Sequence, residues 1–557
     1  MKRLMILLMA ALPMLAMGQG KMNIKVDSVG KLATQLGDQK FKVADLTISG
    51  PLNGADLKLL QNIVTRTKVD KKNPGECLVT AVDLSGVTIV ESKEKEGIKT
   101  EANELPKDFF SGAKHLVKVV LPSSVSAISK GCFSGCSSLV DVTIPASITS
   151  IGNEAFQNCE SLAAITLPSG LKKIDSEAFE GCKSLAAIQL PAGVKEIAKQ
   201  TFSKCKSLKS VNIPDGTKKI GNSAFQSCES LTSIVLPATV EEIEASAFQD
   251  CKSLASIEMA SVSQIGANAF QSCKSLASVK LAKLSKLGQV AFQNCESLKT
   301  VEIQGDLSDI NTGAFQNCTN LTSVSVPATV KVISSHAFDR CKSLAAFEFP
   351  ASVTKINDKS FRECASLRSV VLPASLKSLG DHAFEECTSL EEVTINGPID
   401  EIETNVFTKC GVLRKVVLPA TVARIGRNAF LGCTALSDFT FPLALQTIED
   451  AAFEKCSSLT TITFPAGVKF IGGDAFKGCS GLTFIELPAA LTKLGGSAFQ
   501  ECTALQEVVL NCPTPPAIDG DTFKGVTTTF TVPKGAQQLY AIDKKWSKVS
   551  GIREKTE

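Results

Sequence analysis

The sequence contains few of the residues that usually mark a catalytic site or an aromatic binding surface. Its 557 residues include one Tyr, one Trp and three His, namely Tyr540, Trp546, His115, His336 and His382. Binding surfaces favour Tyr and Trp, so the 29 Phe are better explained as core residues. A phosphate-binding loop, a nucleophile elbow and a metalloprotease motif are also absent from the sequence. We therefore expect no catalytic residues, no cofactor and no enzyme activity.

The chain also lacks an excess of charge of one sign and a long apolar run. With 59 Lys+Arg and 56 Asp+Glu, the net charge of +3 gives no electrostatic reason to expect nucleic acid as a partner. The apolar run at residues 4–15 is too short for a transmembrane helix, and no later segment reaches eighteen apolar residues. Because this run follows Lys2 and Arg3 and precedes small residues near Gly18, it predicts a signal peptide over residues 1–18. The protein is then exported, either secreted or at the cell surface, with the periplasm as an alternative.

One repeat of 23 residues fills most of the chain. Cys stands three residues after Phe from Cys136 to Cys502, and Leu stands six residues after Phe from Leu116 to Leu505. A unit of this length cannot bury its own apolar side, so stacked units must share one core. The sequence therefore predicts a repeat solenoid rather than several globular domains. The repeated Phe residues, with two steps of 22 and a last step of 24, are at positions 110, 133, 156, 179, 202, 225, 248, 270, 292, 315, 338, 361, 384, 407, 430, 453, 476, 499 and 523.

Each unit is expected to contain one short parallel strand and one helical turn. The stretch from Leu185 to Leu190 alternates apolar and polar residues, and Pro191 ends the strand because it cannot donate a hydrogen bond to a sheet. The stretch Ala-Phe-x-x-Cys-x-x-Leu spaces its apolar residues by three, which predicts a helical or 3-10 turn. The predicted fold class is thus an α/β solenoid with one strand and one helical or 3-10 turn per unit.

This pattern resembles the BspA-type leucine-rich repeats of bacterial surface proteins, especially those of Bacteroidetes-like bacteria. The resemblance covers residues 105–525, and the flanks are similar as well, from Ala44 to Asp56 and from Cys512 to Pro516. It implies a right-handed, curved leucine-rich-repeat superhelix on the cell surface. It also implies a role in cell adhesion, either to host matrix proteins or to other cells.

The two ends of the chain do not follow the repeat. Residues 19–104 are expected to form an N-terminal cap with a degenerate first repeat, in which Asn53 caps a helix over residues 56–64. The repeat array then spans 105–525. Residues 526–557 are expected to form a C-terminal cap, because an open solenoid end exposes core and a strand edge. Tyr540 and Trp546 should pack on the last rung; the alternative is a ligand site built by Trp546.

The cysteines are expected to be buried free thiols. Seventeen of the 20 Cys share one register, and neighbouring rungs would suit the Cα distance of a disulfide but not its dihedral angle. Rung-to-rung disulfides stay an alternative, and the redox state of Cys132 and Cys512 is left open. A Cys-x₂-Cys pair is absent, and His336 and His382 lie two rungs apart, roughly 10 Å at a strand spacing of about 4.8 Å. No metal site is therefore expected.

The candidate binding residues stand seven or eight positions after Phe, where strand side chains should face outward on the concave side. Charges alternate between successive units there, and one large aromatic residue occurs where nearly every other unit has a small or polar one. An alternative explanation of these charges stays open: they form cross-strand ion pairs that keep the sheet soluble and have no role in binding. An exposed aromatic residue favours recognition. The candidates are Phe484, Arg368, Glu391, Glu392, Arg414, Lys415 and Asp438.

The sequence as a whole favours a non-enzymatic secreted or cell-surface protein that binds other proteins through an extended solenoid face. Host extracellular matrix and the surface of another cell are the expected partners, and nucleic acid is not. A glycan- or peptide-capturing surface module and a structural spacer are the alternatives.

Overall fold

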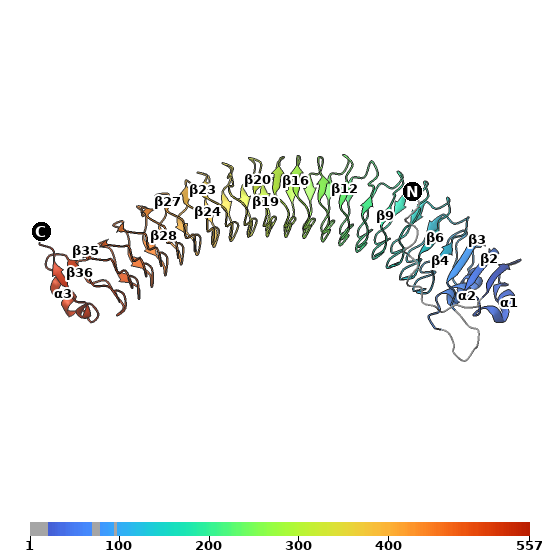
Figure 1. Cartoon of the computed structure of the whole chain (residues 1–557), viewed down its shortest axis with the longest axis horizontal. Helices are drawn as coiled ribbons and strands as arrows, with labels where there is room; N and C mark the ends of the chain where they lie inside the picture. Colours follow the sequence, from blue (N-terminus) through green and yellow to red (C-terminus); the bar gives the residue numbers. More distant parts are fainter. Residues whose placement is uncertain (1–19, 69–77, 94–96, 557) are drawn as a thin grey trace, which may run out of the picture. The chain divides into compact units, whose positions relative to one another are not determined.

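The computed structural model describes residues 20–68, 78–93 and 97–556. The predicted signal peptide, residues 1–18, lies outside these described residues. The chain divides into two compact units, Met1–Pro237 and Ala238–Glu557, and each is described by itself. In both units the chain winds through successive rungs, and the parallel strands of neighbouring rungs lie side by side (Figure 1).

The N-terminal end combines a parallel sheet with short helices. Asn53 caps the longest helix, because its side chain accepts a hydrogen bond from the backbone N–H of Asp56 at 3.1 Å. Asp56 in turn accepts from the backbone N–H of Asn53 at 3.2 Å, so the predicted helix cap is confirmed. The strands pair in the order β1 (Lys21–Lys25), β2 (Asp45–Leu52), β3 (Ala81–Ile89) and β4 (Lys118–Val120). The helices are α1 (Leu32–Leu36), η1 (Gly37–Gln39) and α2 (Gly54–Val64).

A first row of strands begins eight residues after the Phe of most rungs, but the rungs of Phe156 and Phe338 form no strand there. Its inward side chains are mainly buried aliphatic residues, and its outward side chains are mostly small, polar or charged, with exposed Val235 and Val371 among the exceptions. After β4, the row in Met1–Pro237 contains β6 (Asp141–Thr143), β9 (Ala187–Ile188), β10 (Ser210–Val211) and β12 (Ser233–Val235). In Ala238–Glu557 it contains β14 (Ser256–Glu258), β16 (Ser278–Leu281), β18 (Thr300–Ile303), β20 (Ser323–Ser325), β23 (Ser369–Leu372), β25 (Glu392–Ile395), β27 (Lys415–Val417), β29 (Asp438–Phe439), β31 (Thr461–Thr463), β33 (Phe484–Leu487) and β35 (Glu507–Leu510).

A second row of two-residue strands closes most units and was not predicted. Its short length explains why the sequence does not show it, because two residues are too few to display alternation. In Met1–Pro237 it contains β5 (Ala127–Ile128), β7 (Ser150–Ile151), β8 (Lys173–Ile174) and β11 (Lys219–Ile220). In Ala238–Glu557 it contains β13 (Glu242–Ile243), β15 (Gln264–Ile265), β17 (Lys286–Leu287), β19 (Asp309–Ile310), β21 (Val332–Ile333), β22 (Lys355–Ile356), β24 (Ser378–Leu379), β26 (Glu401–Ile402), β28 (Arg424–Ile425), β30 (Thr447–Ile448), β32 (Phe470–Ile471) and β34 (Lys493–Leu494).

The repeated Phe residues form a stacked column in each unit, as the periodicity predicts. Successive ring centroids lie 5.0–5.7 Å apart from Phe110 to Phe225. From Phe248 to Phe523 they lie 5.0–5.9 Å apart. All of these rings except that of Phe523 are fully buried. The column is therefore the core of each unit.

The predicted helical or 3-10 turn around each Phe is not present. In the rung of Phe292, the residues two before and two after the ring, Val290 and Asn294, have φ of 49° and 61°. These left-handed conformations reverse the chain and cannot continue a right-handed helix. The backbone N–H of Phe292 also donates to Ala314 of the next rung at 2.8 Å rather than within its own segment. The three-residue spacing of the apolar side chains thus reflects successive tight turns, in which some backbone N–H groups donate to carbonyl groups of the neighbouring rung.

Helices of the described chain occur only near its ends, and those at the C-terminal end cover the last rungs. The buried Tyr540 donates its hydroxyl to the carbonyl of Cys512 at 2.9 Å, and the buried Trp546 donates Nε1–H to Pro516 at 2.7 Å. Both residues therefore pack as predicted, and Trp546 does not build an exposed ligand site. The elements here are β36 (Thr529–Val532), α3 (Gln537–Ile542), η2 (Trp546–Lys548) and β37 (Ile552–Glu554).

Candidate binding face

Six of the seven predicted binding residues lie together at the start of four paired strands: Glu392, Lys415 and Asp438 are the first residues of β25, β27 and β29, and Arg368, Glu391 and Arg414 directly precede β23, β25 and β27. The parallel register places Glu392 beside Lys415, and Lys415 beside Asp438. Equal positions in successive repeats thus become lateral neighbours. Phe484 is separate, because it lies on β33, two rungs beyond Asp438. The six residues together, which we name the charged strip, are Arg368, Glu391, Glu392, Arg414, Lys415 and Asp438.

Ion pairs account for only part of the charged strip. Arg414 pairs with Glu391, and Lys415 Nζ lies 3.3 Å from Asp438 Oδ2. Exposed pairs of this kind stabilise a protein by roughly 0–1 kcal/mol each. Within the part of the chain that the structure describes, Arg368 and Glu392 are exposed and take part in no ion pair. Ion pairs that keep the sheet soluble account for the paired residues of the strip. They do not account for Arg368 and Glu392, whose charges are available to a binding partner.

An open hollow of about 490 Å³ adjoins the strip and shares Arg368, Glu391 and Arg414 with it. Val412 contributes an apolar wall that is 44% exposed, at a repeat position where most units have Ser. Two guanidinium groups, two hydroxyl groups and this apolar wall suit a polar protein surface better than an enclosed small molecule. We call it the charged hollow; its lining residues are Arg368, Thr388, Ser389, Glu391, Val412, Arg414 and Ala435.

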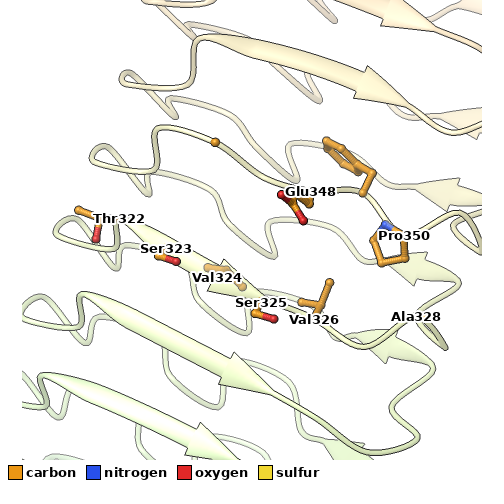
Figure 2. A pocket seen from close by; sticks show the side chains of 10 residues that line it. Thr322, Ser323, Val324, Ser325, Val326, Ala328, Glu348 and Pro350 are labelled. Atoms are coloured by element: carbon orange, nitrogen blue, oxygen red, sulfur yellow. The ribbon is translucent and has the colours of Figure 1, made fainter.

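A second hollow, of about 480 Å³, lies where the first strand row is interrupted (Figure 2). The rung after β20 forms no strand, and its inward positions hold Phe347 and Phe349 instead of the aliphatic residues of neighbouring rungs. These rings pack edge-on at a centroid distance of 4.8 Å. The rung of Phe430 carries Phe439 and Phe441 at the same two positions and still forms β29, so two rings do not by themselves prevent a strand. Figure 2 shows Ser323 and Ser325 on one rung and Glu348 on the next.

Phe484 lines a third hollow of about 460 Å³ near the C-terminal end. Its ring is half-buried rather than fully exposed as the sequence suggests. The structure adds Thr531 and Arg553 to this hollow, and both donate hydrogen bonds to Glu507 Oε1, at 3.0 and 3.1 Å. We call it the aromatic hollow.

Polar residues one position after Phe form a hydrogen-bonded ladder on another side of the rungs. Gln316 Nε2 donates to the buried Asp339 at 2.8 Å, and Arg362 binds the same carboxylate through two nitrogens at 2.9 and 3.1 Å. Burial alone would raise the pKa of Asp339, but the hydrogen bonds from Arg362, Gln316 and His336 hold it below its usual value. His336 is therefore part of a structural network.

A second carboxylate cluster surrounds Arg424, which contacts Glu401, Glu403 and Glu449. Burial, followed by the hydrogen bond and charge of Glu401, raises the pKa of Glu403 to about 7. Burial raises the pKa of Glu401, but hydrogen bonds with Glu403 and Arg424 and the charge of Arg424 lower it below its usual value, so the two carboxylates share one proton near neutral pH. One guanidinium facing three carboxylates accounts for this behaviour without a catalytic role.

The described cysteines are buried free thiols, including Cys132 and Cys512. Thiols between Cys136 and Cys502 donate to a Phe carbonyl of an adjacent part of the array, as Cys295 does to Phe270 at 3.2 Å, whereas Cys512 donates to the carbonyl of Pro488 at 3.2 Å. Burial raises the pKa of these thiols, to about 12 for Cys136 and Cys318, which keeps them protonated and unreactive. They act as small buried donors.

No group of three or more His, Cys, Asp or Glu side chains is arranged to hold a metal ion among residues 20–68, 78–93 and 97–556. Over the same residues, no helix has both the length and the apolar character needed to cross a bilayer.

Comparison with protein families decides the classification. The BspA type leucine rich repeat region matches residues 103–231, 218–345, 308–437 and 424–540, well over half of the chain. The chain belongs to the BspA-type leucine-rich repeat family. The family match thus covers both strand rows of the array, the charged strip and Phe484, whereas Arg553 of the aromatic hollow lies beyond it. A fold of this type is in general a binding scaffold.

Solved structures include bacterial relatives of these BspA-type repeats. A leucine-rich repeat protein from Bacteroides ovatus is 27% identical, with 72% of this chain and 86% of that chain covered and a TM-score of 0.34. A leucine rich cell surface protein from Faecalibacterium prausnitzii is 27% identical, with coverages of 58% and 87% and a TM-score of 0.36. Among curated proteins the comparison found no match.

Sequence reasoning missed several residues of these hollows. Val412 carried a signal, because it replaces the usual Ser of the BspA-type repeat five residues after Phe. Phe349 carried a weaker one, because it stands at an inward strand position that is aromatic in only two other units, at Phe441 and Phe464. Thr531 and Arg553 follow no repeat, and only the pairing of β35, β36 and β37 brings them to Phe484.

Proposed function

We propose that this BspA-type protein is a non-enzymatic, exported binding protein whose charged strip contacts protein partners. Adhesion to host matrix proteins or to other cells is the role that we propose for it. The observation that carries the proposal is the pair of exposed charges without ionic partners, Arg368 and Glu392, next to the charged hollow. Arg is among the residues that contribute most to protein interfaces.

The shape of the face supports a protein partner. The charged hollow is open, and its strands expose further apolar side chains, with Val371 62% and Val417 43% exposed. A broad contact of charged residues around exposed apolar ones is typical of a protein interface. An enclosed cavity would instead suit a small molecule or a reaction.

The test measures binding of the full chain to immobilised fibrinogen, fibronectin, laminin and collagen by biolayer interferometry. We expect binding to at least one of them, and Arg368→Ala should weaken that binding by about tenfold, the effect of losing an interface Arg. Glu392→Ala should also weaken it, because both charges would face the partner.

Arg427→Ala is the matched control, because Arg427 is also exposed, pairs with Asp450 at 3.3 Å and lies outside the strip. It should leave binding unchanged. Equal effects of Arg368→Ala and Arg427→Ala would show that the strip is not the contact. Absence of binding to all four proteins would contradict the adhesive role and favour a spacer.

A further inference from the structure

The aromatic hollow differs from the charged strip in composition, and it lies on a different sheet. Strand pairing places Phe484 beside Glu507, and Thr531 beside Arg553. The strands β31, β33, β35, β36 and β37 form one uninterrupted five-stranded sheet. A peptide that adds a strand needs an unpaired edge; β37 is an edge of this sheet, whereas β33 and β35, which carry Phe484, Glu486 and Glu507, are paired on both sides.

The ring of Phe484 gives the hollow an aromatic surface. The equivalent residue of the preceding rung, paired with it in register, is Thr461. Phe484 is half-buried, so the ring is held by its surroundings while part of it lines the hollow. A fixed aromatic ring on an open surface suits a ligand that presents a flat apolar patch.

The polar groups next to the ring are held in place by one another. Glu507 Oε1 accepts from Thr531 Oγ1 and Arg553 Nη2, and Glu486 Oε1 accepts from Asn511 Nδ2 at 2.8 Å. Within the described chain, the second carboxylate oxygen of Glu486 and of Glu507 accepts no hydrogen bond. These two oxygens are therefore preorganised acceptors, which lowers the entropy lost on binding.

The charge of the rim disfavours an acidic ligand. Glu486, Glu507 and Glu554 outnumber Arg553 and Lys555, which leaves an excess of one negative charge. Free carboxylate acceptors need a ligand with several O–H donors. A neutral sugar presents an apolar C–H face on one side and hydroxyl groups at its edge, and the hollow of about 460 Å³ is within the size range of small-molecule sites.

We propose that the aromatic hollow is a second binding site, separate from the charged strip, and that it takes a neutral oligosaccharide. The sugar ring stacks on Phe484, while Glu486 and Glu507 accept hydrogen bonds from its hydroxyl groups. Arg553 and Thr531 hold Glu507 in position and are positioning residues. This site does not depend on the protein-binding role of the strip, because the two lie on different strands.

The experiment titrates the full chain with maltotriose, cellotriose, xylotriose, laminaritriose, mannotriose and chitotriose, each to about 10 mM, by ligand-observed NMR and calorimetry. The acidic probe is 3′-sialyllactose. We expect at least one neutral trisaccharide to bind in the millimolar range or better and the acidic probe to bind more weakly. Phe484→Thr should weaken neutral binding by at least tenfold, and Glu486→Gln by a smaller factor.

Phe484→Thr is chosen because it copies Thr461 of the preceding rung, so the strand should still form. Phe484→Trp should keep binding, since it preserves the aromatic surface, and Arg368→Ala should leave it unchanged. The proposal is overturned if no neutral trisaccharide binds, if Phe484→Thr binds as well as the parent, or if the acidic probe binds best. None of these results would bear on binding to matrix proteins.

Discussion

Val290 occupies the most demanding backbone position in the repeat. It has φ of 49°, and among the described residues with left-handed φ it is the one β-branched side chain. Neighbouring rungs place Asn268 and Gly313 at the same position, two residues before Phe. A β-branched residue in this conformation is strained by about 1–3 kcal/mol. Val290→Asn should therefore stabilise its rung.

The size of the effect follows from two opposing contributions. Asn tolerates the left-handed conformation, so the substitution should relieve about 1–2 kcal/mol of strain. Val290 is half-buried, and a Cβ built on Gly313 would lie 2.8 Å from Val290 Cγ1, so the two residues are in close contact. Loss of this apolar contact costs about 0.5–1 kcal/mol. The net expected gain is about 0.5–1 kcal/mol.

The assay is hydrogen exchange followed by mass spectrometry, because a long repeat protein does not unfold in one two-state step. Peptides that cover the rungs of Phe292 and Phe315 should exchange about twofold to fivefold more slowly in Val290→Asn. The reverse change, Asn268→Val, should speed exchange in its own rung. Faster or unchanged exchange in Val290→Asn, together with no effect of Asn268→Val, would refute the strain argument.

Three further predictions concern the core, pH and thiols. Phe315→Ala should destabilise Ala238–Glu557 by about 3–5 kcal/mol, because it removes a fully buried ring; a thermal melt with no loss would contradict the Phe column as core. Glu403 has a pKa of about 7 in the folded protein and an ordinary value of 4.5, so the stability of the protein should fall as pH rises between these two values. Thermal melts at pH 5 and pH 8 should show that Glu403→Gln weakens this pH dependence. An identical pH dependence in the parent and the variant would contradict the prediction. Thiol titration in denaturant should find the 19 described cysteines free, whereas native protein should react slowly; a titre of only a few thiols would indicate disulfides.

The candidate site was only partly visible in the sequence. The row of Arg368, Glu391 and Arg414 could be predicted, because the parallel register turns a repeat position into a lateral neighbour. The pairing of Arg414 with Glu391 could not, because two neighbouring Arg residues compete for the same carboxylate. The aromatic hollow depends on Arg553 and Thr531, which lie in a segment without repeats, so no periodicity pointed to them.

The sequence by itself determined the stacked column of Phe rings, the strand after it and the buried thiols beside it. These features depend on local spacing and on burying apolar area, and both repeat along the chain. Only the tertiary structure decided that the segment around Phe is a series of tight turns. There, each second backbone N–H bonds to the next rung, and that partner is fixed only once the rungs stack. The same holds for the interrupted strand row at Phe347 and Phe349, because the rung of Phe430 has Phe at the same two positions and still forms β29, so the residue pattern of one unit does not fix whether its strand pairs.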